Sequence, residues 1–279
     1  MELMLPALVA ALLLLGLHAY LGIHIIARGV IFVDLAIAQM AALGWTAAVY
    51  AGFAAGSTGA YLIGLLTTLF AAGLFSVTRM DHPYITQEAI IGIVFVVASA
   101  ATILLASQAP RGAEHVEELL TGSLLWVTWP KIARIAVVYG LLGTLHWLLR
   151  RRFLTISLQP QLARSAGWSV KVWDFLFYAL FGIMVTLSVD VAGVLLVFSF
   201  LVIPAVIAFL FTGRPGRLLA IAWLSGSAAT VAGLLVSYWA DLPTGPVVVC
   251  AFAAALLIAS VLRRLTGPGS LPPAEEAGP

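Results

Sequence analysis

Long hydrophobic runs, separated by short polar connections, dominate the pattern of this chain. Each run approaches the roughly 20 apolar residues that a helix needs to cross the hydrocarbon core of a bilayer. The runs cover residues 4–26, 30–52, 58–77, 89–107, 132–149, 172–188, 192–211, 218–238 and 246–262. The pattern therefore predicts an all-α fold, a polytopic bundle of about nine transmembrane helices.

Composition supports a membrane protein. Of the 279 residues, 62% are hydrophobic and only 9% are charged, so the chain has too little polar surface to cover a soluble globule. We expect one transmembrane domain over residues 1–265. The remaining residues, 266–279, are rich in Pro, Gly and Glu, which predicts a disordered cytoplasmic tail.

The orientation follows from the basic residues. Residues 150–171 hold five of the 14 Lys and Arg residues, and such clusters beside hydrophobic spans stay on the cytoplasmic side. With this loop inside, alternating spans place Arg263 and Arg264 inside as well. The N-terminus is then outside and the C-terminus cytoplasmic. The longer connection at 108–129 falls on the outer face, where residues 114–127 have the spacing of a short surface helix.

Small residues at helical spacing predict close helix packing within the bundle. One set is Ser225, Ala229 and Gly233, and another is the alanine-rich run that ends at Gly44.

Motifs of membrane enzymes are absent from the sequence. It contains no G-x-x-x-x-G-K-[ST] loop for ATP, no H-E-x-x-H and no G-x-S-x-G. The single cysteine, Cys250, excludes a disulfide within the chain. The five histidines are scattered, and we interpret His18 and His146 as hydrogen-bond donors between helices. We predict no catalytic residue and no cofactor held by this chain.

Asp34 is the clearest ionisable residue inside a span, and such residues are candidates for function. Its carboxylate and the amide of Gln39 offer oxygen ligands for a divalent cation. Five residues along a helix place them about 140° apart, so they cannot chelate one ion together. The alternative is structural, with Asp34 paired to Arg28 and Gln39 bonded to a neighbouring helix.

Two further residues have alternative interpretations. Pro204 interrupts a span in its middle, where a broken backbone often borders a transport pathway, although proline is also common in ordinary membrane helices. Glu88 stands just before an apolar run and is a candidate for capping the fourth helix. We take Asp34, Gln39 and Pro204 as pathway candidates, and Asp34 as the weak candidate for a metal ligand.

Six segments in order resemble the permeases of ATP-binding-cassette importers of the zinc, manganese and iron type. The resemblance covers about residues 12–262. The segments are RGVIF at 28–32 with Gly44, QEAIIGIVF at 87–95, LLTGSLLWV at 119–127, QLARSAG at 161–167, AGVLLVFSFLVIPAVIA at 192–208 and DLPTGPVVV at 241–249.

The resemblance implies a fold similar to that of the cobalamin importer, in a bacterial cytoplasmic (inner) membrane. It also implies a dimer of permeases around one pathway, two cytoplasmic ATPases that bind ATP, and an extracytoplasmic substrate-binding protein. The loop at 155–168 would form the coupling helices that dock on the ATPases, with contacts from Gln159, Leu162, Ala163 and Gly167. Residues 119–126 would face the binding protein.

The second span departs from the family pattern. Zinc and manganese members typically carry G-D-x-x-x-H there, whereas the corresponding residues here are Asp34, Leu35 and Gln39. The acid is displaced by one position and an amide replaces the histidine. Despite this departure, the resemblance as a whole leads us to expect a permease for a divalent transition metal, zinc, manganese or iron, that depends on partner ATPases.

Alternatives to this reading remain open. One alternative is a permease whose substrate is a metal chelate instead of the bare ion. A different class is an ATP-independent secondary transporter with Asp34 as a relay. A membrane enzyme or scaffold comes third, because it would need a catalytic constellation or a large soluble domain that the sequence lacks.

Overall fold

A computed structural model of the chain describes residues 4–54, 56–78, 84–108 and 121–267. Within these ranges it forms α-helices, one short 3-10 helix and no strand, which confirms the all-α prediction. The helices are α1 (Met4–Arg28), α2 (Val33–Tyr50), α3 (Thr58–Val77), α4 (Gln87–Ala106), η1 (Leu124–Trp126), α6 (Trp129–Leu158), α7 (Pro160–Ser165), α8 (Val170–Phe211), α9 (Pro215–Ala240) and α10 (Thr244–Leu265). The predicted tail beyond Gly267 and the first half of the predicted surface helix, residues 114–120, lie outside the described residues.

Eight of the described helices are long and apolar enough to cross a membrane. The count is one lower than the number of predicted spans because α8 contains two of them in 42 residues. Inside α8 the backbone leaves the helical region at Gly193, with φ 74° and ψ 162°. Essentially only glycine adopts this conformation. The predicted spans 172–188 and 192–211 therefore exist, joined by a break at one residue instead of a loop.

Local sequence accounts for several helix ends. Ser57 and Thr86 precede α3 and α4, and their side chains accept hydrogen bonds from the backbone N–H of Ala60 and Ala89. These are N-caps, which satisfy donors that the first turn leaves free. Proline stands in the first turn of α6, α7 and α9, where its missing N–H has no cost. Gly29, with φ 68°, ends α1.

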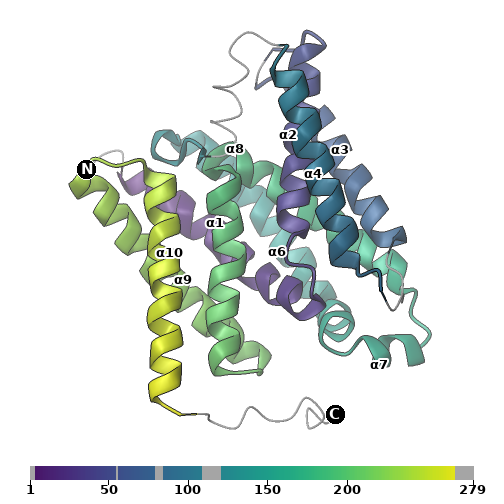
Figure 1. The fold of residues 1–279 in the computed structure, drawn as a ribbon, viewed down its shortest axis with the longest axis vertical. Coiled ribbons are helices and arrows are strands. Elements are labelled where there is room, and N and C mark those ends of the chain that lie inside the picture. The colour runs from purple at the N-terminus through teal and green to yellow at the C-terminus, as the bar shows by residue number, and fades with distance from the viewer. Residues whose placement is uncertain (1–3, 55, 79–83, 109–120, 268–279) are drawn as a thin grey trace.

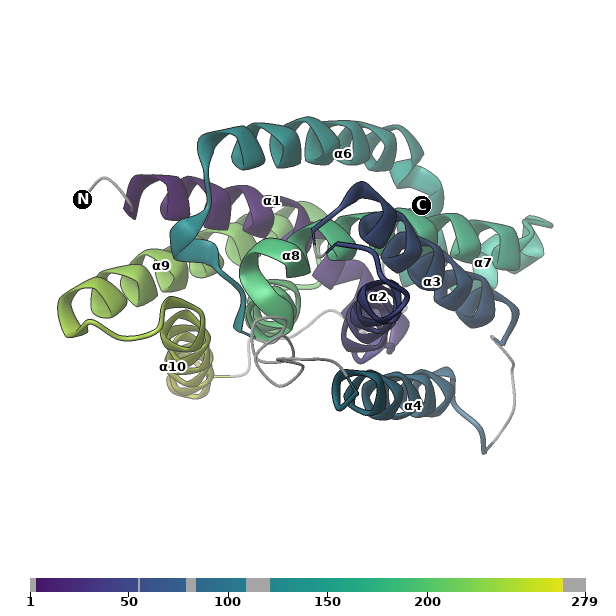
Figure 2. The same cartoon turned by 90° about the horizontal axis from the view of Figure 1, so that it is seen from above.

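Helices α1 and α8 lie at the centre of the bundle (Figure 1). On one side of them stand α2, α3 and α4, and on the other α9 and α10. Figure 2 shows that α6 covers one face of the bundle, while α4 and α10 lie toward the opposite face. The short α7 projects at the same end of the molecule as the last turn of α10.

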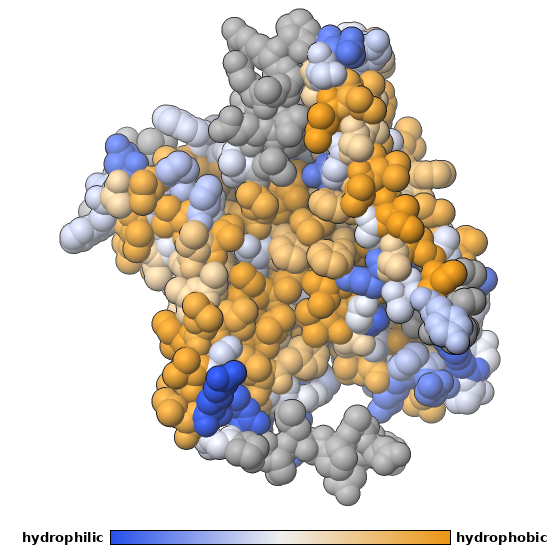
Figure 3. Space-filling model, viewed as in Figure 1, coloured by the Kyte–Doolittle hydropathy of each residue, from blue (hydrophilic) through white to orange (hydrophobic). Residues whose placement is uncertain are grey.

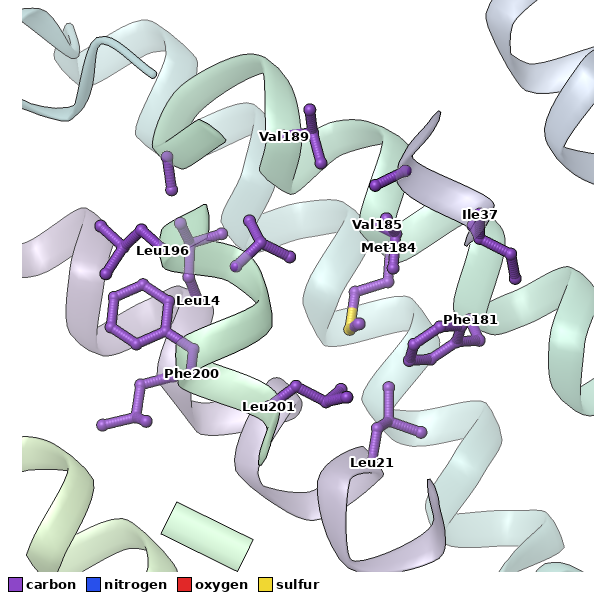
Figure 4. Packing of buried hydrophobic residues seen from close by; sticks show 14 of the residues in the cluster. Leu14, Leu21, Ile37, Phe181, Met184, Val185, Val189, Leu196, Phe200 and Leu201 are labelled. Atoms are coloured by element: carbon purple, nitrogen blue, oxygen red, sulfur yellow. The ribbon is translucent and has the colours of Figure 1, made fainter. Parts of the chain in front are cut away.

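Buried side chains of α1 and of both halves of α8 form the central core. Figure 4 shows Leu14 and Leu21 of α1 against Phe181 and Met184 before the break and Phe200 after it. The contact is close because Gly22 has no side chain. A Cβ atom built on Gly22 would lie 1.9 Å from the carbonyl oxygen of Leu201.

The small residues predicted to allow close packing do so at two helix pairs. A Cβ on Gly44 of α2 would lie 2.7 Å from the Cα of Gly64 in α3. A Cβ on Gly233 of α9 would lie 2.7 Å from the Cα of Val248 in α10. Backbones that approach this closely gain van der Waals contact, which is a main source of helix association in lipid.

The surface has the distribution of an integral membrane protein. Apolar residues cover most of the face in Figure 3, and hydrophilic residues gather toward its upper and lower ends. Arg263 and Arg264 belong to the last turn of α10, the helix that ends at the lower side of the molecule in Figure 1. Exposed apolar side chains on several long helices are expected where lipid, rather than water, is the surrounding solvent.

Candidate translocation and coupling sites

Asp34 is a buried carboxylate without a described partner. It lies in the first turn of α2 and is 1% exposed. No hydrogen-bond partner for its Oδ1 atom is found among the described residues. Burying a carboxylate is unfavourable unless it is neutral or meets a cation or donor. Asp34 is therefore suited chemically to receive a cation.

The proposed pair between Asp34 and Arg28 is wrong. Arg28, at the end of α1, instead binds Asp174 near the start of α8, with 2.7 Å between Nη1 and Oδ1. Both side chains are almost completely buried. The guanidinium group also lies 4.0 Å from the centre of the Phe177 ring, in a cation–π contact.

Arg28 also connects α6 to this ion pair. Its Nε atom donates to the hydroxyl of Ser157 at 2.8 Å. The same hydroxyl lies 2.9 Å from Nδ1 of His24, one turn earlier in α1. Ser157 stands just before α7 in the chain and Asp174 stands shortly after it. Arg28 therefore joins the two helices that flank α7.

Glu88 caps α2 rather than its own helix. Its Oε1 atom accepts a hydrogen bond from the backbone N–H of Phe32 at 3.0 Å. The N-cap of α4 is Thr86. Thr86, and not Glu88, is therefore the cap of the fourth helix, although Glu88 does lie in the first turn of α4, where the helix dipole favours an acid. This bond ties α4 to the turn that presents Asp34.

The other two pathway candidates lie in different surroundings. Gln39 is half-buried on α2. Pro204 is buried in the second half of α8, and a Cβ on Gly226 of α9 would lie 3.2 Å from its Cγ. Pro204 thus packs toward α9, and no described contact joins it to Asp34 or Gln39. Its assignment to a pathway stays a prediction.

The interpretation of two histidines as donors between helices is wrong. Nδ1 of His18 lies 2.7 Å from the carbonyl oxygen of Leu14 in its own helix. Neither ring nitrogen of His146 has a described hydrogen-bond partner. Across the described residues, no three His, Cys, Asp or Glu side chains gather closely enough to hold a metal ion.

The four coupling candidates lie on or beside α7. Gln159, Leu162 and Gly167 are exposed, and Leu162 presents 54% of its surface. Ala163 is fully buried, so its side chain packs inward. Gly167 has φ 70° and ends the helix: its N–H donates to the Arg164 carbonyl, and the N–H of Trp168 donates to the Ala163 carbonyl. The result is a short, well-terminated helix with an exposed leucine.

The opposite end of the bundle is organised around the break in α8. The N–H of Ser123 donates to the carbonyl of Val191 at 3.0 Å, beside the break. A Cβ on Gly122 would lie 2.2 Å from the carbonyl carbon of Ala192. A Cβ on Gly245, at the start of α10, would lie 2.7 Å from the carbonyl oxygen of Thr121. Residues 121–127 are therefore wedged between α8 and α10.

A model of the ABC 3 transport family matches residues 1–263, nearly the whole chain. The chain belongs to the ABC 3 transport family. Among its relatives is a Haemophilus influenzae protein named "Probable iron transport system membrane protein", 26% identical over 88% of this chain and 85% of that protein. The Yersinia pestis "Chelated iron transport system membrane protein YfeD" is 25% identical over 73% of this chain and 69% of its own length.

A solved structure has the same fold as this ABC 3 family member. The structure is of PsaBC from Streptococcus pneumoniae in complex with Fab, and the match has a TM-score of 0.77. It covers 93% of this chain and 91% of the other, at 21% sequence identity. The family and the fold together establish an integral membrane subunit of a transporter, and they set aside the interpretation as a secondary transporter.

Several segments that carried the resemblance have visible structural roles in this ABC 3 family member. Residues 28–32 form the tight connection that places Arg28 and Asp34 at the junction of α1 and α2. Residues 121–127, the described part of segment 119–127, meet segments 192–208 and 241–249 near the break in α8, through Gly122, Gly193 and Gly245.

Three residues of the Arg28 network had no assigned role in the sequence analysis. They are His24, Ser157 and Asp174. One signal for Asp174 was present, because it is an acid within the predicted span 172–188. Ser157 carried no such signal.

Proposed function

We propose that this chain is the permease subunit of an ATP-driven importer for a divalent transition metal. The observation that carries the proposal is the arrangement of α7. It is a short exposed helix whose flanking helices are joined through Arg28, so a force applied to α7 reaches α1, α6 and α8 together. These connections suit a helix on which an ATPase acts, because movement of α7 would be transmitted to the membrane-spanning helices.

We propose Asp34 as a pathway residue that meets the metal. Carboxylate oxygens suit manganese and also bind zinc and iron beside other ligands, and Asp34 is a buried carboxylate with an unpaired oxygen. It is closed off from solvent in this conformation. Contact with the cargo therefore belongs to another state of the transport cycle, in which α2 and its neighbours separate.

The pathway is proposed to lie between two copies of the chain. One copy contributes too few ligands, because its described residues bring no three metal-binding side chains together. A two-fold axis doubles every ligand that faces it. The full importer then contains two permeases, two cytoplasmic ATPases and an extracytoplasmic binding protein. The mass of the intact purified complex measures the number of permease copies.

The proposed orientation has α7 and the C-terminal end of α10 in the cytoplasm. It is supported by the basic residues at 150–152 and by Arg263 and Arg264 at the same end of the molecule. Replacing Cys250 with serine and introducing one cysteine at Gln159 tests it. An impermeant maleimide should label this cysteine in inside-out vesicles and leave it unlabelled in right-side-out vesicles.

Uptake by the reconstituted importer tests the function. The permease is purified with its ATPase and binding protein, placed in liposomes and supplied with zinc, manganese or iron isotopes. We expect ATP-dependent uptake of at least one metal. An ATPase partner unable to hydrolyse ATP is the control and should abolish uptake.

The other outcomes separate the alternatives. Uptake of iron only when a chelator is supplied would identify a chelate as the cargo, as the name of the Yersinia pestis relative states for that protein. An assembled complex with active ATPase that moves neither ions nor chelates would refute the proposal.

A further inference from the structure

A cavity of about 410 Å³ lies at the end of the bundle opposite α7, where α3 and α6 begin. Ser57, Thr58 and Tyr61 line it from the start of α3, and Lys131 and Arg134 line it from the first turns of α6. Asp190 and Val189, beside the break in α8, form another wall. None of these residues takes part in the proposed coupling or pathway.

The charges around the cavity favour an anion. Lys131 is neutralised by Asp190, with 2.9 Å between Nζ and Oδ2. Arg134 follows one turn later and has no ion pair or hydrogen bond to any described residue. Its guanidinium group lies 5.7 Å from the centre of the Tyr61 ring. One positive charge of the cavity therefore remains uncompensated.

The start of α3 adds to this preference. The first N–H groups of a helix have no partner within the helix, and its dipole is positive at that end. The Ser57 hydroxyl satisfies the N–H of Ala60. The earlier N–H groups of the first turn remain available near Ser57 and Thr58, which line the cavity. Helix N-termini and arginine are both common ligands of phosphate.

The surface below the cavity is apolar. On α6, Val137 and Leu141 follow Arg134 at helical spacing and are strongly exposed. On α3, Leu62 and Leu66 follow the residues that line the cavity, and both are also strongly exposed. A polar cavity large enough for a phosphate-containing headgroup, beside exposed hydrocarbon, matches the two parts of a phospholipid, its headgroup and its acyl chains.

We propose that this cavity binds the phosphate group of an anionic phospholipid. The lipid's acyl chains lie against the exposed apolar residues of α3 and α6. Lipid binding at this cavity requires only the membrane-spanning fold. It goes beyond metal transport and does not depend on which cargo the protein carries. In the proposed orientation the lipid belongs to the outer leaflet.

Photolabelling of the purified full-length protein tests this site. A phosphatidylglycerol with a photoreactive group near its headgroup is mixed with the protein in detergent, and labelled peptides are identified by mass spectrometry. We expect labelling of peptides that contain Tyr61 or Arg134. A phosphatidylethanolamine probe with the same chains, which has no net charge, should label them less.

Charge variants make the test specific. Arg134→Gln should lower labelling at the site about fivefold at limiting probe, because one basic residue near a membrane surface contributes about that factor to the binding of an anionic lipid. Asp190→Asn should raise labelling, because it removes a negative charge and frees Lys131. Arg151→Gln, at the other end of α6, is the matched control and should leave labelling at Tyr61 unchanged.

Two results would overturn the proposal. One is equal labelling of the wild type and Arg134→Gln at this site. The other is the absence of phosphatidylglycerol labelling on peptides that contain Tyr61 or Arg134; binding of inorganic phosphate at millimolar concentration by the same protein would then identify a free anion as the ligand. Neither result depends on uptake of metal, so a failed transport assay leaves this test intact.

Discussion

Arg28 and Asp174 form a buried ion pair between α1 and α8, with 2.7 Å between the guanidinium Nη1 and the carboxylate Oδ1. They lie 146 positions apart in the chain. The pair sits beside the two helices that lead into and out of α7. The ion pair therefore helps to hold in place the helices to which the proposed coupling helix is attached.

Removing one partner of this pair should be strongly destabilising. Arg28→Gln leaves Asp174 as a buried charge without its cation, and such changes cost about 3–5 kcal/mol of unfolding free energy. Denaturant titration in mixed micelles measures the loss. The double variant with Asp174→Asn should be more stable than Arg28→Gln alone. Asp190→Asn is the control: its partner Lys131 is exposed, so the expected cost is below about 1 kcal/mol.

Asp34→Asn should lower metal transport without lowering the stability of the protein. Because the carboxylate has no described partner, its neutralisation should leave the unfolding free energy unchanged or raise it. Metal uptake should fall by about tenfold or more, as expected when a metal site loses a ligand or its support. Uptake and unfolding are measured on the same preparation. Normal uptake of every metal tested would remove Asp34 from the pathway.

The break in α8 should tolerate only glycine. Gly193→Ala places a side chain at φ 74° and should cost about 1–3 kcal/mol. Gly122→Ala should also destabilise, because the new methyl group would overlap the backbone of Ala192. Gly140→Ala is the matched control. It lies in α6 with no atom near the new methyl group, so it should stabilise the protein by about 0.5–1 kcal/mol. Thermal unfolding of the three variants checks the order.

Leu162→Ala should uncouple the ATPase without unfolding the permease. Leu162 is exposed on α7, so its removal should change stability by no more than about 0.5 kcal/mol. If it anchors the ATPase, binding should weaken at least about fivefold, the effect of losing an interface contact worth about 1 kcal/mol. Uptake and stimulated ATP hydrolysis are the measurements. Leu141→Ala, an exposed leucine in the middle of α6, should behave as the wild type in both.

The sequence was sufficient to predict the membrane spans and the segment that contains the short helix α7, while the coupling role of that helix stays a prediction. Length and hydropathy determine which segments cross a membrane, and the clustered basic residues marked the segment that contains α7. The exposure of Leu162 was compatible with its predicted role. Ala163, from the same segment, proved buried, because sequence similarity identifies a segment but not the face that each side chain occupies.

The contacts between residues far apart in the chain could not be predicted from the sequence. Arg28 lies six positions from Asp34, which made that pair a natural expectation. The observed partner, Asp174, becomes available only when α8 packs against α1. Likewise, the acceptor role of Glu88 toward Phe32 depends on how α4 lies beside α2. Hydrophobic periodicity contains no information about these tertiary neighbours.

The single-residue connection at Gly193 limits how the end of the protein opposite α7 can move. Two spans joined by a loop can slide past each other. The two halves of α8 can change their relative orientation only by rotation about φ and ψ of Gly193. Gly122 touches the backbone at that point, and Ser123 is hydrogen-bonded to Val191. A change in the angle between the halves would therefore also disturb residues 121–127, so this segment restrains bending of α8 at the end of the bundle opposite α7.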